Sequence, residues 1–144
     1  MTIIVHDNQS FSLTTGQPTA TSQQGYVSKA SPEGEKIRPL NPIKLALASN
    51  ATFIARANAR DIAHTAEVLR KAIKHKGCSF VEIIQDCLIF NKDMNAKDKM
   101  MYKIEDNKDK KKAEKLADEW DYNLKDGKIP LGVIYCSENR LSLE

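Results

Sequence analysis

The sequence predicts an α/β fold built on a mostly parallel sheet. Three short apolar runs, at residues 2–6, 52–56 and 79–84, have the β-branched composition of buried strands. Two segments with helical signals, at residues 42–50 and 62–76, separate them. Strands that alternate with helices form parallel sheets with right-handed crossovers, and ligands bind such sheets at the carboxyl ends of the strands.

Length and composition fit one ordinary globular domain. The chain has 144 residues, of which 41% are hydrophobic and 28% are charged, and this is enough for a single core. Its apolar runs are too short to cross a membrane, and a net charge of +3 is too small to indicate a nucleic-acid partner. Three widely spaced cysteines, at positions 78, 87 and 136, indicate the reducing cytoplasm rather than a disulfide scaffold.

The first strand, residues 2–6 (TIIVH), is apolar on both faces, which predicts a central position in the sheet. It ends at Asp7 and Asn8, two residues that favour turns. Residues 7–41 then follow no period of 2 or 3.6 and are rich in Ser, Thr, Gln, Gly and Pro. A loop of this length is either a floppy surface segment or a ligand-binding loop.

Two helices are expected in the first half of the chain. Asn41 and Pro42 suit the N-cap and the first position of a helix that ends near Asn50. Asp61 caps the second helix, residues 62–76. One apolar stripe at helical spacing is expected to face the sheet, and it consists of Ile62, Ala66, Leu69 and Ile73.

The rest of the chain is more highly charged. Residues 91–128 hold eleven lysines and ten acidic residues, including three consecutive lysines at 110–112. Because the acids neutralise the lysines, a solvated helix face is favoured over a phosphate-binding stripe. A last strand at residues 131–136 and a polar tail at 139–144 follow a helix whose apolar edge is Ala113, Leu116, Ala117 and Trp120.

Residues that follow the first and third strands are candidates for chemistry. Asn8 and its neighbours carry oxygens that suit Mg²⁺, although the same residues also form simple Asx turns. Residues 14–17 (TTGQ) offer hydroxyls and a flexible backbone to a phosphate, without a Walker or Rossmann glycine pattern. Cys87 follows the third strand; a lone cysteine is most often core filler, and the alternatives are a metal-cluster ligand or a nucleophile.

Five segments carry a recognisable pattern: DNQSFSLTTGQ at 7–17, ATFIAR at 51–56, KAIKHKGCSFVE at 71–82, CLIFN at 87–91 and IPLGVIY at 129–135. They resemble, in order and over nearly the whole chain, the D-N-x-x-Y-x-L-T-x-G-Q, ATFVAR, AIKHKGFSFVE, C-x-x-F-N and IPIGVIY motifs of 2-oxoacid:ferredoxin oxidoreductase β subunits. These proteins are thiamine diphosphate enzymes. Phe11 stands where the family usually has Tyr, and Ser12 where it often has Gly.

The resemblance implies a three-layer fold, the carboxyl half of a thiamine-diphosphate-binding fold. That half would be residues 1–86, and a helical, charged β-subunit extension would be residues 87–144. The resemblance also implies that Asn8 gives a side-chain oxygen, and Ser10 its backbone carbonyl, to the Mg²⁺ that holds the cofactor diphosphate. The other implied cofactor-binding residues are Leu13, Thr14, Gly16 and Gln17, and Cys87 would be the last of four cysteine ligands of a [4Fe–4S] cluster.

The implied activity is oxidative decarboxylation of a 2-oxoacid, pyruvate or 2-oxoglutarate, to acyl-CoA, with electrons that pass through the cluster to ferredoxin. The implied partners are an α subunit, a γ subunit where the enzyme has one, and ferredoxin. The chain is then either a truncated gene product or the partner of a separately encoded amino-terminal half of the β subunit. The family's G-D-G motif and three other cluster cysteines lie upstream of the matched region, so we expect no catalytic residue in this chain and no turnover by it alone. The alternatives are a non-catalytic binding module that kept the fold, and an unrelated flavodoxin-like domain.

Overall fold

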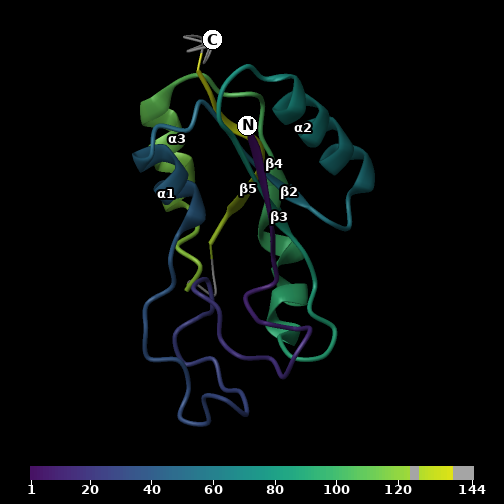
Figure 1. The fold of residues 1–144 in the computed structure, drawn as a ribbon, viewed down its shortest axis with the longest axis vertical. Coiled ribbons are helices and arrows are strands. Elements are labelled where there is room, and N and C mark those ends of the chain that lie inside the picture. The colour runs from purple at the N-terminus through teal and green to yellow at the C-terminus, as the bar shows by residue number, and fades with distance from the viewer. Residues whose placement is uncertain (124–126, 138–144) are drawn as a thin grey trace.

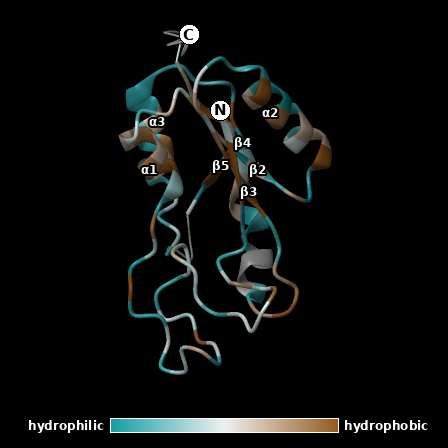
Figure 2. Cartoon of the chain, viewed as in Figure 1, coloured by the Kyte–Doolittle hydropathy of each residue, from teal (hydrophilic) through white to brown (hydrophobic). Residues whose placement is uncertain are grey.

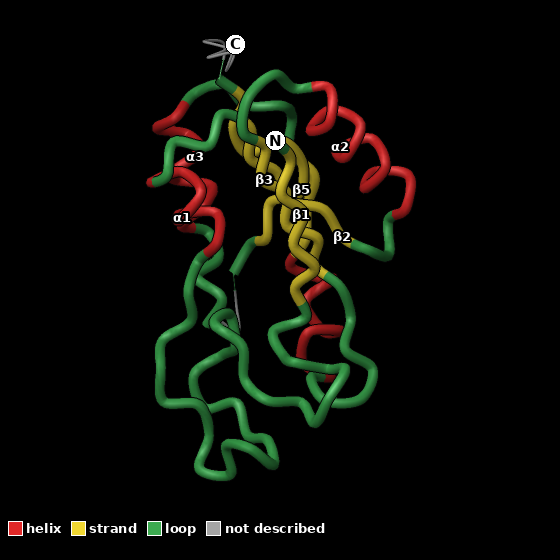
Figure 3. Tube along the Cα trace, in the orientation of Figure 1, coloured by secondary structure: helices red, strands yellow, loops and turns green. Residues whose placement is uncertain are grey.

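The structure, a computed structural model, describes residues 1–123 and 127–137 as an α/β fold with three layers (Figure 1). Helices α1 (Pro42–Ala48) and α3 (Lys110–Asp118) cover one face of a five-stranded sheet, and α2 (Ile62–Lys74) covers the other (Figure 3). This arrangement confirms the predicted fold class. In the described ranges, no helix is long and apolar enough to span a membrane.

The sheet combines a parallel part with two added strands. Its strands are β1 (Thr2–Asp7), β2 (Phe53–Asn58), β3 (Ser79–Ile84), β4 (Met101–Lys103) and β5 (Ile129–Cys136), in the order β1-β3-β2-β5-β4. β3 pairs in parallel with β1 and β2, as the alternation of strands and helices predicts. β5 runs antiparallel to β2 and parallel to β4. The sequence pattern does not predict β4 or the preceding 3-10 helix, η1 (Lys92–Met100).

Each face of the sheet buries its own apolar cluster. Along β2 the side chains alternate, so that Ile54 packs with α1 and α3 while Phe53 and Ala55 pack with α2. A third cluster, at the carboxyl ends of the parallel strands, consists of Ile84, Trp120, Tyr122, Ile129 and Leu131. In Figure 2 the central strands are largely hydrophobic, whereas the long loop between β1 and α1 is mostly hydrophilic or neutral.

β1 lies at one edge of the sheet, where the sequence predicts a central strand. Among the described strands it pairs with β3 alone, and Ile3 and Ile4 are 40% and 43% exposed. An apolar pattern reports the chemistry of both faces but not the number of neighbouring strands, and it also fits a strand that is internal to a larger sheet and exposes an edge in this chain. The outer edge of β1 therefore presents unpaired backbone groups.

α2 turns towards the sheet with a different face from the predicted one. Val68 and Ala72 are buried, whereas Ile62 and Ile73 are 78% and 67% exposed. Leu69 packs partly against the core. The helix therefore presents Val68 and Ala72 to the sheet in place of most of the predicted stripe.

Candidate functional site

Two loops leave the sheet at the carboxyl ends of adjacent parallel strands and meet there. Residues 8–17 follow β1 and residues 85–91 follow β3. The side-chain amide of Asn91 donates a hydrogen bond to the backbone oxygen of Asn8 (3.1 Å). The two segments that the sequence places at this edge of the sheet therefore lie together.

The sulfur of Cys87 is the point at which these loops converge. The hydroxyls of Ser12 and Ser10 lie 3.1 Å and 3.6 Å from it. The backbone N–H groups of Phe90 and Asn91 donate to it over 3.3 Å and 3.2 Å. Burial by itself would raise the pKa of the thiol, but these hydrogen bonds lower the pKa of Cys87 to about 7. The surroundings favour the thiolate, which is the form that binds metal ions.

Asn8 is joined to the same sulfur through Ser12. Its Nδ2 donates to the Ser12 hydroxyl (2.8 Å), and its Oδ1 accepts from the backbone N–H of Ser10 (3.2 Å). The second contact is the Asx turn, which is the simpler interpretation of these residues. It uses one of the two lone pairs of Oδ1, and the hydroxyl of Ser10 lies 3.5 Å from the same oxygen, a long contact that a cation would replace. The turn and an oxygen ligand for a hard cation are therefore compatible.

Gln9 anchors this segment to the protein interior. Its side chain is fully buried, and its backbone has a left-handed φ of 55°. Nε2 donates to the backbone oxygens of Thr21 (2.5 Å) and Tyr122 (3.1 Å), and Oε1 accepts from Nζ of Lys97 (2.6 Å). The polar atoms of the side chain are thus satisfied. Sequence reasoning identifies neither Gln9 nor Lys97, because their contact joins residues 88 positions apart.

Asp7 shapes the first turn of the loop from the end of β1. Its buried Oδ1 accepts from the backbone N–H of Gln9 (2.8 Å) and from the hydroxyl of Thr21 (2.7 Å). Its Oδ2 has no hydrogen-bond partner among the described residues. Burial and the nearby charge of Glu82 raise the pKa of Asp7 to about 6. Asp7 therefore holds the loop at a cost in free energy at neutral pH.

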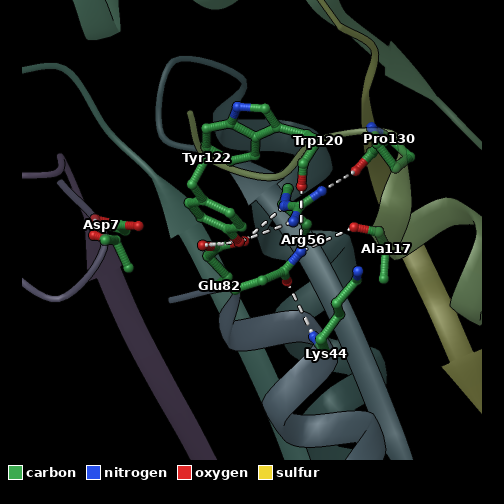
Figure 4. Close-up of polar contacts among 10 residues, drawn as sticks. Asp7, Lys44, Arg56, Glu82, Ala117, Trp120, Tyr122 and Pro130 are labelled. Carbon is green, nitrogen blue, oxygen red and sulfur yellow. Dashed lines mark hydrogen bonds and ion pairs between the residues drawn. The ribbon is translucent and has the colours of Figure 1, made fainter. Parts of the chain in front are cut away.

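A buried ion pair lies below this edge of the sheet (Figure 4). Nε of Arg56 donates to Oε2 of Glu82 (2.6 Å), and Nη2 of Arg56 donates to the hydroxyl of Tyr122 (2.9 Å). That hydroxyl donates to Oε1 of Glu82 (2.6 Å). Trp120 stacks on Tyr122 with the ring centroids 4.0 Å apart. The network connects β2 and β3 to the segment after α3, and Tyr122 in turn contacts Gln9.

The other predicted cofactor-binding residues lie further along the loop. Leu13 is fully exposed, and Thr14 is exposed with its hydroxyl donating to Oε1 of Gln17. Gly16 has a φ of 73° and lies under the ring of Phe90, so that a Cβ at this position would come within 2.6 Å of the ring. Gly16 therefore belongs to the packed part of the site, while Leu13, Thr14 and Gln17 form the outer turn.

The described residues fit partial ligand sets for metal ions. Within residues 1–123 and 127–137, no group of three His, Cys, Asp or Glu side chains is placed to hold a metal ion. Cys87 suits one soft ligand position, and Asn8 and Ser10 offer oxygens that suit part of a hard-cation shell. Any metal ion at this edge would need further ligands.

Comparison with known proteins identifies the family. A family model described as "Thiamine pyrophosphate enzyme, C-terminal TPP binding domain" matches residues 1–83. The chain belongs to this family. The boundary that the sequence places between residues 1–86 and 87–144 stays a prediction, although the match of this TPP-binding domain ends close to it.

The relatives of this chain are oxidoreductase subunits. The chain is 36% identical over 150 residues to the 2-oxoacid:ferredoxin oxidoreductase subunit beta of a Sulfolobus species, covering 96% of this chain and 49% of the relative. It is 46% identical over 91 residues to the 2-oxoglutarate oxidoreductase subunit KorB of Mycobacterium tuberculosis, covering 63% and 24%. These matches confirm the resemblance. The chain spans about half the length of the ferredoxin oxidoreductase beta subunits it matches.

A solved structure has the same fold. It is the 2-oxoglutarate:ferredoxin oxidoreductase from Magnetococcus marinus with 2-oxoglutarate, coenzyme A and succinyl-CoA bound. The TM-score is 0.87 at 30% sequence identity, and the match covers 96% of this chain and 48% of the other. The unrelated flavodoxin-like alternative is thereby excluded.

Proposed function

We propose that this chain forms part of the β subunit of a 2-oxoacid:ferredoxin oxidoreductase. The observation that carries the proposal is the convergence of the Asn8–Ser12 segment and Cys87 at one edge of a thiamine-family sheet. A loop with oxygen ligands beside a hydrogen-bonded thiolate is an arrangement that serves a metal-bound diphosphate and a metal cluster at neighbouring positions. The names of the relatives support the same assignment.

In this proposal the loop after β1 holds the cofactor. Oδ1 of Asn8 and the backbone carbonyl of Ser10 are ligands of Mg²⁺, which binds the diphosphate of thiamine diphosphate. Leu13, Thr14, Gly16 and Gln17 line the cofactor. Bound thiamine diphosphate supplies the electron sink for decarboxylation of the 2-oxoacid. The protein contributes position: the buried side chain of Gln9 keeps Asn8 and Ser10 on the side of the second loop.

Cys87 is proposed as one ligand of a [4Fe–4S] cluster. Its thiolate character supports this role, because deprotonated sulfur is the form that coordinates iron. The hydroxyl of Ser12 and the backbone N–H groups of Phe90 and Asn91 surround the sulfur, and such hydrogen bonds are a usual means of tuning cluster potentials. The cluster passes electrons to ferredoxin, and coenzyme A takes the acyl group.

The resemblance implies two substrates, and 2-oxoglutarate is the one to test first, since four of the relatives and the solved structure carry it in their names. Pyruvate is the second substrate to test. The proposed partners are the α subunit, a γ subunit where present, ferredoxin, and the polypeptide that supplies the rest of the β subunit. None of the three cysteines forms a disulfide in the part of the chain that the structure describes, which agrees with the reducing, cytoplasmic setting of this proposal.

The test is to prepare this chain alone and together with the polypeptides that complete the enzyme, and to measure iron, thiamine and 2-oxoacid-dependent reduction of ferredoxin in the presence of coenzyme A. We expect turnover, iron and thiamine in the assembled enzyme and no turnover by the chain alone. Cys87→Ser should lower the iron content, whereas Cys78→Ser, a half-buried thiol before β3, should not. An assembled protein without iron and thiamine would favour the non-catalytic binding module instead.

A further inference from the structure

The hydroxyl of Ser12 lies between the amide of Asn8 and the sulfur of Cys87. Nδ2 of Asn8 is 2.8 Å from Oγ of Ser12, and that oxygen is 3.1 Å from Sγ of Cys87. Oγ of Ser10 is also 2.9 Å from Oγ of Ser12. One hydroxyl therefore joins the residue proposed to bind Mg²⁺ with the residue proposed to bind the cluster.

The direction of these hydrogen bonds follows from counting protons. A serine hydroxyl has one proton and two acceptor lone pairs, whereas an amide nitrogen only donates. Ser12 therefore accepts from Asn8. A metal-bound or thiolate sulfur carries no proton, so Ser12 is the donor in its contact with Cys87. The single proton of the Ser10 hydroxyl points either to Ser12 (2.9 Å) or to the sulfur (3.6 Å), and both arrangements leave Ser12 as the donor to Cys87. The chain of donors then runs one way, from Asn8 through Ser12 to Cys87.

We propose that Ser12 couples the cofactor loop to the cluster, so that occupation of the Mg²⁺–thiamine diphosphate site raises the reduction potential of the cluster held by Cys87. This inference rests on the proposed function. A cation at Oδ1 of Asn8 withdraws electron density from the amide and makes its N–H a stronger donor, which in turn strengthens the Ser12 hydroxyl as a donor. Donors to cluster sulfur stabilise the reduced, more negative form.

The coupling is reciprocal. If occupation of the cofactor site favours the reduced cluster, reduction of the cluster must tighten cofactor binding by the same factor. Ser12 is a tuning residue in this scheme, since it acts on the iron through Cys87 and on the cation through Asn8. The family often has Gly at this position, so the coupling is expected to distinguish this chain from relatives without the hydroxyl.

Removal of the hydroxyl should leave the ligand itself in place. The backbone N–H groups of Phe90 and Asn91 still donate to Cys87 when Ser12 is changed. Ser12→Ala should therefore change the reduction potential of the cluster without loss of the cluster from the protein. A matched control is Ser28→Ala, in the same loop, where the hydroxyl accepts only a local turn contact from the backbone N–H of Ser31.

The experiment uses the assembled oxidoreductase that contains this chain. The midpoint potential of the cluster is titrated by electron paramagnetic resonance, with and without Mg²⁺ and thiamine diphosphate, for the wild type, Ser12→Ala, Ser12→Thr and Ser28→Ala. We expect a higher potential in the loaded wild type than in the unloaded one. Ser12→Ala should have a lower potential and lose this difference, Ser12→Thr should restore both, and Ser28→Ala should match the wild type.

Two results would overturn the inference in different ways. A difference between loaded and unloaded enzyme that is as large in Ser12→Ala as in the wild type would show that Ser12 does not couple the sites, while the proposed function would stand. Wild-type enzyme without iron or thiamine, measured on the same samples, would overturn the proposed function and the inference with it.

Discussion

At the scale of single residues, the acidic neighbour of Cys87 forms an ion pair that turns it away from the sulfur. Asp86 precedes the cysteine and forms an ion pair with Arg60, which also pairs with Asp98. The sulfur itself receives hydroxyl and N–H donors. A carboxylate next to a metal-binding thiolate is therefore compatible with the proposed role, because its charge is directed to a guanidinium.

Asp7 should make the stability of the fold depend on pH. Its pKa rises from 3.8 to about 6 on folding, mainly through burial. Since the folded state binds this proton more tightly than the unfolded chain, the contribution of the protonated carboxyl is complete below about pH 4 and is lost as the pH rises through about 6. The loss at pH 7 is about 3 kcal/mol. Urea unfolding between pH 4 and pH 7 measures it.

Asp7→Asn should remove most of this slope, because the amide oxygen still accepts from Gln9 and Thr21 without carrying a charge. Glu33→Gln, at an exposed site, is the control and should keep the wild-type slope. An Asp7→Asn variant that loses stability with pH as the wild type does would contradict the prediction.

The residues of the site differ in how far the sequence reveals them. Asn8, Ser10 and Cys87 are recognisable because they stand in motifs at the ends of predicted strands, and the structure brings them together. Gln9 and Lys97 are not recognisable, because the hydrogen bond from the Lys97 amine to the Gln9 side-chain oxygen forms only when the chain folds. Local patterns report short-range geometry, whereas contacts between distant segments depend on the whole topology.

At the scale of elements, the strands and helices of the first half follow the sequence closely. Asn41 and Asp61 cap their helices through side-chain oxygens, as their types predict. β3 begins and ends at the predicted residues, and the long loop before α1 has no regular element besides isolated bridges. β4 escapes prediction because three residues are too few to show a period.

Substitutions on the two faces of α2 test which face packs against the sheet. Val68→Ala should lower the free energy of unfolding by about 2 kcal/mol, because it removes two buried methyl groups and leaves a cavity against the sheet. Ile73→Ala should change it by less than about 0.5 kcal/mol, because this side chain is largely exposed. Urea unfolding of both variants decides between the faces. The reverse order of the two effects would restore the stripe predicted from periodicity.

At the scale of the whole molecule, the buried Arg56–Glu82 pair links the sheet to the segment that follows α3. Glu82→Leu should destabilise the chain by about 3–5 kcal/mol, because it leaves a fully buried guanidinium without its carboxylate. The double variant Arg56→Met with Glu82→Leu should recover part of this loss, since no unpaired charge remains. Chemical unfolding of the two variants measures the difference. A double variant less stable than Glu82→Leu would contradict this account.

The outer edge of β1 is where we expect the chain to associate. In a parallel pair, alternate residues of a strand bond to one neighbour. The backbone oxygens of Met1 and Asp7 accept hydrogen bonds from Ser79 and Gln85, so the odd-numbered residues of β1 face β3. The N–H of Val5 therefore points to β3, and the N–H of Ile4 points to the open edge. An unpaired edge with exposed Ile3 and Ile4 favours pairing with another strand. We therefore expect the isolated chain to self-associate as its concentration rises.

Proline substitutions in β1 distinguish the role of its outer edge from the role of its pairing with β3. Ile4→Pro removes an outward N–H without loss of a bond to β3, so it should give a folded chain that stays monomeric in sedimentation equilibrium. Val5→Pro removes an inward N–H and should instead destabilise the fold by several kcal/mol, on the order of the cost of an interior proline. The same Ile4→Pro chain should fail to join the proposed polypeptide that completes the β subunit if both associations use the outer edge of β1. A wild-type chain that remains monomeric at high concentration would show that the edge is closed in some other way.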